Sequence, residues 1–324
     1  MRSGLELGPG PSVWDCISTV RKGLSLRALP FPDIVVVIFA TSGSRWTTNT
    51  LLGLNIAIQE VDALTFFGNA NLPAPNAHLL ILGHQFAPPD IPLPGHVEPL
   101  KENIDMAHVD IFFQRLQEVL HEVHEGVVTD FATHLLEHVV GLAPPPRIIE
   151  HQSNFTFLMG GMRVSAKPDL NIREGVGNLL LIQEDKVTLQ SLPGYSTAVA
   201  DNTKRRTRTY HEDRAEPQLV AEFVGAYRSD ESRRAREGLP AIVLPHTYFG
   251  LIMTGVAPRF YKIVITTDFL NAVNASQPAP VQVVVERFTP PVPDPENFDF
   301  DGMEPLNNRW VCMQAFEALR LKLL

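Results

Sequence analysis

An unbroken apolar run leads directly into a group of charged residues. The run is Leu179-Leu180-Leu181-Ile182, and Glu184, Asp185 and Lys186 follow it after one glutamine. A short apolar run of this kind is typical of a strand that is covered on both faces of its sheet. Charges that follow such a strand are costly to bury unless they are paired or bound to a metal. The sequence therefore predicts a sheet between helices, with a polar site at the end of one strand.

Helical and strand-like segments alternate after residue 105. Apolar residues recur at helical spacing over residues 109–123 and 127–139, before Gly141 and three prolines. Further segments follow in this order: strands at 155–159, 162–166 and 179–182, a helix at 217–227, strands at 247–254 and 260–266, a helix at 268–273, a strand at 281–285 and a helix at 310–324. Helices interleaved with a mixed sheet define an α/β layered domain.

The first third of the chain shows no such order. Proline-rich stretches separate short apolar pieces, so we expect an N-terminal extension over residues 1–104 and one domain over residues 105–324. The apolar run at 34–40 is expected to be a strand, because it is far shorter than the roughly 20 residues of a membrane helix. The N-terminus has no secretory pattern, and two cysteines suit a reducing compartment. We expect an intracellular protein, in nucleus or cytoplasm, without a membrane segment.

The charge of the chain is unevenly distributed. A formal net charge of −9 argues against nucleic-acid binding over the whole surface. A local basic run nevertheless occurs at Lys204, Arg205, Arg206 and Arg208. Taken alone, such a run is more often a solvated loop than a binding patch.

Asp169, Glu184 and Lys186 are expected to converge on one small volume. Side chains alternate along a strand, so Glu184 and Lys186 project to one side while Asp185 points to the other. Asp169 is expected to end the strand at 162–166. The connection at 171–177 contains two glycines and is short enough to make the two strands antiparallel neighbours.

Two carboxylates and a lysine form a set with specific chemical value. Carboxylate oxygens hold Mg²⁺ or Mn²⁺ and leave positions for water and a substrate phosphate. Such an ion activates a water molecule and neutralises charge on the leaving phosphate oxygen. A lysine ammonium orients the attacking water or stabilises the charge of the transition state. The structural alternative is a strand end with solvated charges.

The pattern Pro168-Asp169 followed by Glu184-Asp185-Lys186 resembles that of the PD-(D/E)XK nuclease superfamily. More closely, segments at 179–186, 216–227 and 255–266 are similar to proteins of mushroom-forming fungi that carry this domain. The resemblance covers about residues 105–324. It implies a three-layer restriction-endonuclease-like core, in which a helix, three strands, a helix and a strand build a central mixed sheet flanked by helices. It also implies metal-dependent cleavage of DNA or RNA phosphodiesters, whereas the fungal likeness implies no particular substrate.

The resemblance assigns a role to individual residues. Asp169 and Glu184 match the metal-binding acids, and Lys186 matches the catalytic lysine. Many members add a glutamate from the first helix, for which Glu125 is the first candidate and Glu137 the second.

The resemblance also indicates residues that would bind the substrate or support the site. Gln218 lies where some exonuclease-like members place a glutamine near the site, although an exposed glutamine at a helix start would look the same. The basic run Lys204–Arg208 precedes that helix, and near the site it would contact substrate phosphates. Tyr210 would then be placed to stack on a base.

Two alternatives remain at this stage. His134, Glu137 and His138 match the His-x-x-Glu-His pattern of inverted zinc peptidases, with Glu212 or Glu216 as a possible third ligand. Histidines are frequent in this region, so the match arises easily by chance. The other alternative is a catalytically inactive module that keeps the nuclease fold and binds nucleic acid or protein.

Overall fold

The computed structural model describes residues 40–77, 79–83, 106–121, 124–175, 178–186 and 214–324. All of them belong to the unit that spans Val37–Leu324. The strand expected at 34–40 lies outside the described residues, apart from Ala40, as does the basic run with Tyr210. Within the described part of the chain, no helix is long and apolar enough to cross a membrane.

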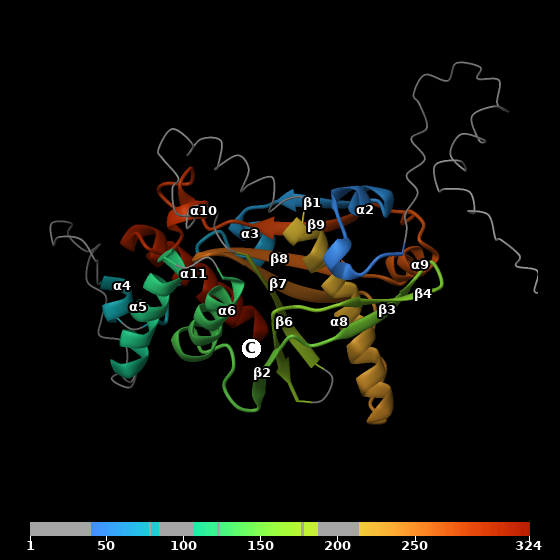
Figure 1. Ribbon diagram of the computed structural model, residues 1–324, viewed down its shortest axis with the longest axis horizontal. Coiled ribbons are helices and arrows are strands. Elements are labelled where there is room, and N and C mark those ends of the chain that lie inside the picture. The colour runs from blue at the N-terminus through green and yellow to red at the C-terminus, as the bar shows by residue number, and fades with distance from the viewer. Residues whose placement is uncertain (1–39, 78, 84–105, 122–123, 176–177, 187–213) are drawn as a thin grey trace, which may run out of the picture. The chain divides into compact units, whose positions relative to one another are not determined.

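A seven-stranded mixed sheet forms the centre of the fold (Figure 1). The strand order is β1-β9-β8-β7-β6-β5-β2; β1 pairs with β9 and β6 with β7 in parallel, and the other neighbours are antiparallel. The bounds are β1 Ile56–Glu60, β2 Arg147–His151, β5 Leu170–Glu174, β6 Asn178–Lys186, β7 His246–Thr254, β8 Ala257–Ile265 and β9 Val283–Phe288. The fold is therefore α/β with a central mixed sheet, as the sequence predicts.

Helices cover both faces of this sheet (Figure 1). One apolar core contains residues of α3 (Ala63–Phe67), α4 (Leu79–Gly83), α5 (Met106–His121), α6 (Glu125–His134), the π-helical turn η3 (Leu135–Val139), α10 (Phe298–Asp301) and α11 (Leu306–Leu323). The other core contains residues of α2 (Thr48–Gly53), α8 (Glu216–Arg236) and α9 (Thr267–Ala275). The short turn η2 (Gly43–Arg45) precedes α2 in the chain. Helices are thus confirmed at every place where the sequence predicts one.

Strand β6 separates the two cores. Leu181 packs into the core of α5 and α6, and Ile182 packs into the core of α8. Residues beyond Ile182 continue this alternation, so the charged end of the strand lies between α6 and α8. The expectation of a strand covered on both faces is confirmed.

The sequence-based assignment of the strands around Asp169 is wrong. Asp169 does not end the strand at 162–166; it directly precedes β5, and residues 171–174, expected to be a connection, are part of that strand. The predicted strands at 155–159 and 162–166 exist as β3 (Phe155–Met159) and β4 (Met162–Ala166), but they form a separate two-stranded sheet. The antiparallel neighbour of β6 is β5.

Part of the N-terminal third belongs to the same body. Strand β1 extends the sheet beyond β9, and Trp46, Leu54 and Phe66 are buried in its two cores. Residues 40–77 and 79–83 therefore contribute to the sheet and to its covering layers.

The β3–β4 hairpin packs directly on α8. A methyl group added at Gly225 of α8 would lie 2.7 Å from Cβ of Phe155, which is too close for either backbone to remain in place. Gly225→Ala is therefore expected to destabilise the fold by about 1–3 kcal/mol, although alanine is the better helix former. Denaturant unfolding measures the change in the free energy of unfolding.

Gly126→Ala is the matched control for this substitution. A Cβ at Gly126 of α6 meets no described atom within 4 Å, so the stability should stay unchanged or rise slightly. Equal effects of the two substitutions would contradict the tight packing of the hairpin on α8.

Candidate active site at the end of strand β6

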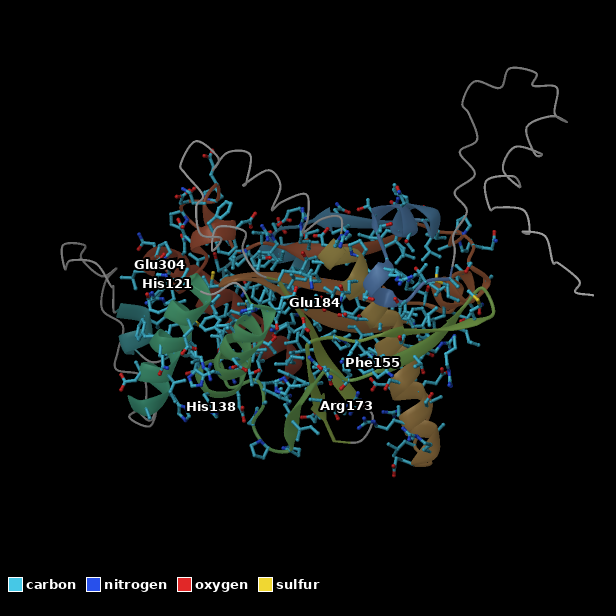
Figure 2. The ribbon with its side chains drawn as sticks, in the orientation of Figure 1. His121, His138, Phe155, Arg173, Glu184 and Glu304 are labelled. Atoms are coloured by element: carbon cyan, nitrogen blue, oxygen red, sulfur yellow. The ribbon has the colours of Figure 1, made fainter. Side chains whose placement is uncertain are left out.

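The last three residues of strand β6 are charged and buried. Glu184, Asp185 and Lys186 are 1%, 0% and 6% exposed. The side chain of Lys186 bonds to that of Glu184, while Oδ1 of Asp185 accepts a hydrogen bond of 2.7 Å from Nε2 of Gln183. These contacts confirm that Glu184 and Lys186 share one side of the strand and that Asp185 points to the other. Figure 2 shows Glu184 between the ribbons of α6 and α8.

Asp169 joins this group from the neighbouring strand. It directly precedes β5, and its Oδ2 accepts a hydrogen bond of 2.8 Å from the backbone N–H of Asp185. Its own carbonyl accepts a hydrogen bond from the N–H of Gln152. The side chain is thereby fixed beside the end of β6.

Helix α6 brings a further carboxylate to the site. The helix begins at Glu125, where an acidic side chain suits the positive end of the helix dipole. Oε1 of Glu125 lies 3.5 Å from Nζ of Lys186. Half of the Glu125 side chain is exposed, so this residue stands between the buried group and solvent.

Helix α8 brings Glu222, which the sequence analysis missed. Glu222 is fully buried and faces Glu184 closely enough for the two carboxyl groups to share a hydrogen bond when one is protonated. Nε2 of Gln218 lies 3.4 Å from Oε1 of Glu222, one helical turn away. The four-residue spacing of Gln218 and Glu222 is the signal that could have identified Glu222, since such residues share one face of a helix.

Burial and mutual repulsion disfavour the charged forms of these acids. Burial raises the pKa of Glu184 to about 7, and Asp169 adds to this against the opposing charge of Lys186. Burial also raises the pKa of Asp169, although the N–H of Asp185 opposes the shift. The pKa of Glu222 lies well above its ordinary value through burial and the charge of Glu184.

Lys186 is the cation in contact with these acids. Burial alone would lower its pKa, but the charges of Glu184, Glu125 and Asp169 outweigh burial and raise it. The amine therefore stays protonated at neutral pH. A protonated lysine suits electrostatic stabilisation and orientation of a water molecule rather than proton abstraction.

The donor set fits a hard divalent cation. Among the described residues, no N–H or O–H group donates to Oε2 of Glu184 or Oε2 of Glu222, and both atoms are buried. Several carboxylates around one lysine leave an excess of negative charge, which a cation would neutralise. Oxygen ligands of this type select Mg²⁺ or Mn²⁺ over softer metals. Asp169, Glu184 and Glu222 are the residues that would hold such an ion.

The structure brings most of the predicted site residues together. Asp169, Glu184, Lys186, Glu125 and Gln218 lie within this one group. Glu137, the second candidate for the helix glutamate, lies instead beside His138, with 3.5 Å between the carboxylate and Nε2. Lys204, Arg205, Arg206 and Arg208 lie outside the described residues.

The histidines of the zinc-peptidase pattern meet a different third residue from the one that the sequence suggests. Glu216 is not near a histidine ligand set, because its carboxylate bonds to Arg287 and to the hydroxyl of Tyr261. Glu212 lies outside the described residues. A different residue, His108 of α5, completes the histidine group formed by His134 and His138.

No protein-family model matches the chain, and no curated protein has a matching sequence.

Asp185 allows a direct test of how strongly this region is desolvated. Burial raises its pKa to about 8, and Asp169 contributes, while hydrogen bonds from Thr129 and Gln183 oppose the shift. The folded protein thus binds this proton more tightly than the unfolded chain does, whose aspartates titrate near pH ~3.9. The stability contribution of Asp185 is complete below that value and is lost as the pH rises to about 8.

Asp185→Asn should remove this loss. In the presence of a chelator, the variant should gain stability relative to the wild type as the pH rises from about 4 to about 8, on the order of a few kcal/mol. Denaturant unfolding across this range measures the difference. Stability curves that stay parallel from low to high pH would show that Asp185 is not titrating in this window.

Proposed function

We propose that the protein is a metal-dependent nuclease that hydrolyses phosphodiester bonds of DNA or RNA. The observation that carries the proposal is the group formed by Asp169 and the buried Glu184 and Glu222 around the protonated Lys186. Hydrolysis of a phosphodiester needs an activated water and stabilisation of a negatively charged transition state. A divalent cation held by these carboxylates would supply both effects.

The topology around the site supports the resemblance to PD-(D/E)XK nucleases. Ignoring the inserted β3–β4 hairpin, the order α6, β2, β5, β6, α8, β7 is helix, three strands, helix, strand. The first three strands are antiparallel neighbours, and α8 connects β6 to the parallel strand β7. We therefore propose that the central sheet is the three-layer restriction-endonuclease-like core.

Each residue has a role in this proposal. Asp169 and Glu184 bind the metal, and Glu222 completes the ligand set from α8. Lys186 orients water or stabilises the charge that develops on the phosphate. Glu125 holds the exposed side of Lys186, and Gln218 positions the carboxylate of Glu222 through the contact of 3.4 Å.

Substrate phosphates would be held by the basic run at Lys204, Arg205, Arg206 and Arg208. The segment that carries this run begins after Lys186 and ends before Gln218, and both of these residues belong to the site. This connection supports a role for the run as positioning charge.

The proposal predicts the effects of two isosteric substitutions. Asp169→Asn removes a charged ligand, and Lys186→Met removes the ammonium group while keeping much of the side-chain length. Each should lower Mg²⁺- or Mn²⁺-dependent cleavage by roughly 100-fold or more. Cleavage is measured on single- and double-stranded DNA and RNA, with circular dichroism to verify folding.

Exposed residues provide the controls. Asp268→Asn on α9 and Lys322→Met on α11 make the same chemical changes at exposed positions, and both variants should cleave like the wild type. Full activity of either site variant would exclude the assigned roles. A wild type that binds metal but cleaves none of the substrates would instead identify the alternative, an inactive nuclease-fold module that binds nucleic acid or protein.

A further inference from the structure

Three histidines from two helices meet at a second place in the protein. His108 belongs to α5, His134 ends α6 and His138 lies in the π-helical turn η3. One ring nitrogen from each lies within 4.8 Å of the others. The rings of His108 and His138 stack with centroids 4.2 Å apart, and the ring of His134 lies 5.2 Å from that of His138.

The local backbone explains why these side chains converge. His134 and His138 are four residues apart, which places them on one face of a regular helix. The helix widens there, since the N–H of Val140 bonds to the carbonyl of Leu135 at 2.8 Å. Such π-helical turns occur frequently at functional sites. Helix α5 packs against this region and adds His108 from a distant part of the sequence.

Hydrogen bonding sets the tautomer of one ring in the cluster and leaves one buried nitrogen of another without a partner among the described residues. Nε2 of His134 lies 2.9 Å from the carbonyl oxygen of His108 and must donate to it, so the neutral ring carries its lone pair on Nδ1. This is the arrangement in which a second-shell carbonyl fixes the tautomer of a metal ligand. Nδ1 of His108 is buried, and no described residue forms a hydrogen bond with it.

Charge and exposure in the cluster also suit a metal. His134 is buried, and an imidazole binds metal in its neutral form. The side chain of His138 is 37% exposed, which gives an ion access from solvent. The carboxylate of Glu137, 3.5 Å from His138, adds a negative charge at the entrance.

We propose that His108, His134 and His138 form a site for a transition-metal ion, with Zn²⁺ as the preferred occupant. Three imidazoles suit Zn²⁺, Co²⁺ and Ni²⁺, whereas Mg²⁺ prefers oxygen ligands. Bonds of about 2.0–2.1 Å require the three nitrogens to lie within the 4.8 Å that already separates them at most, and rotations of the side chains would set the final geometry. A water molecule would occupy the fourth position.

This site is separate from the carboxylate group at the end of β6. His134 lies nine residues after Glu125 on α6, which corresponds to about 14 Å along the helix. Figure 2 also shows His138 well away from Glu184. The bound ion would tie α5 to the end of α6, and the inference does not depend on the proposed nuclease activity.

Metal titrations of the full chain test the site. After treatment with a chelator, the wild type is titrated with Zn²⁺ by calorimetry and with Co²⁺ by visible absorption. His108→Ala and His138→Ala should each weaken Zn²⁺ binding by about 100-fold or more, because even loss of an outer-shell partner costs 10–100-fold. Both should also lose the Co²⁺ spectrum, and circular dichroism verifies that they fold.

Two further variants distinguish metal binding at the three histidines from metal binding elsewhere on the protein. His151→Ala removes an exposed histidine at the end of β2, and Glu184→Gln alters the carboxylate group; both should retain the Zn²⁺ affinity and the Co²⁺ spectrum of the wild type. Unchanged binding in His108→Ala and His138→Ala would overturn the proposal. Equal loss in His151→Ala would also overturn it, since binding would then be nonspecific.

Discussion

The arrangement of this protein around its candidate site depends on one electrostatic constraint, which is the burial of several carboxylates around one lysine. Buried charges destabilise a fold unless partners compensate them. Lys186 bonds to Glu184 and lies near Glu125, but Asp169, Asp185 and Glu222 bring further acidic groups. The pKa values of Glu184 and Asp185 rise to about 7 and about 8. A cation would relieve this repulsion and stabilise the fold.

The fold places these groups through the geometry of one strand. In β6, the neighbouring residues Leu181 and Ile182 pack into opposite cores, and the charged side chains that follow continue this alternation. Glu184 therefore faces Glu222 of α8, while Asp185 lies near Thr129 of α6. Each helix contributes to the site because it covers one face of the same strand.

Hydrophobic patterning predicts helices α5, α6, α8, α9 and α11 and the more apolar strands of this fold, but not the short helices α2, α3, α4 and α10. It does not predict β2 or β5, because polar residues occupy buried positions in both. Arg173 of β5 is fully buried and bonds to Asp230 and to Glu150, and Asn171 is equally buried. Such positions are stabilised by partners far along the chain, and no local pattern reveals them. The same limit applies to β1, which pairs with β9 across more than two hundred residues.

The candidate site was more predictable than the strands that carry it. Alternation along an apolar strand predicts Glu184 and Lys186, and the sequence also predicts Asp169 beside them, although it assigns Asp169 to the wrong strand. The antiparallel pairing with β6 was expected, but β5 provides it instead of β4. Glu222 escaped notice because it lies among the apolar residues of α8. His108 escaped because it is distant in sequence from the two histidines that it meets.

The most direct test of the central claim is calorimetric titration of Mn²⁺ into the metal-free protein. Wild type and His108→Ala should bind Mn²⁺ equally, and Glu184→Gln should lose binding while remaining folded. Absence of binding to the folded wild type, or equal binding to Glu184→Gln, would contradict a metal site built on the buried carboxylates.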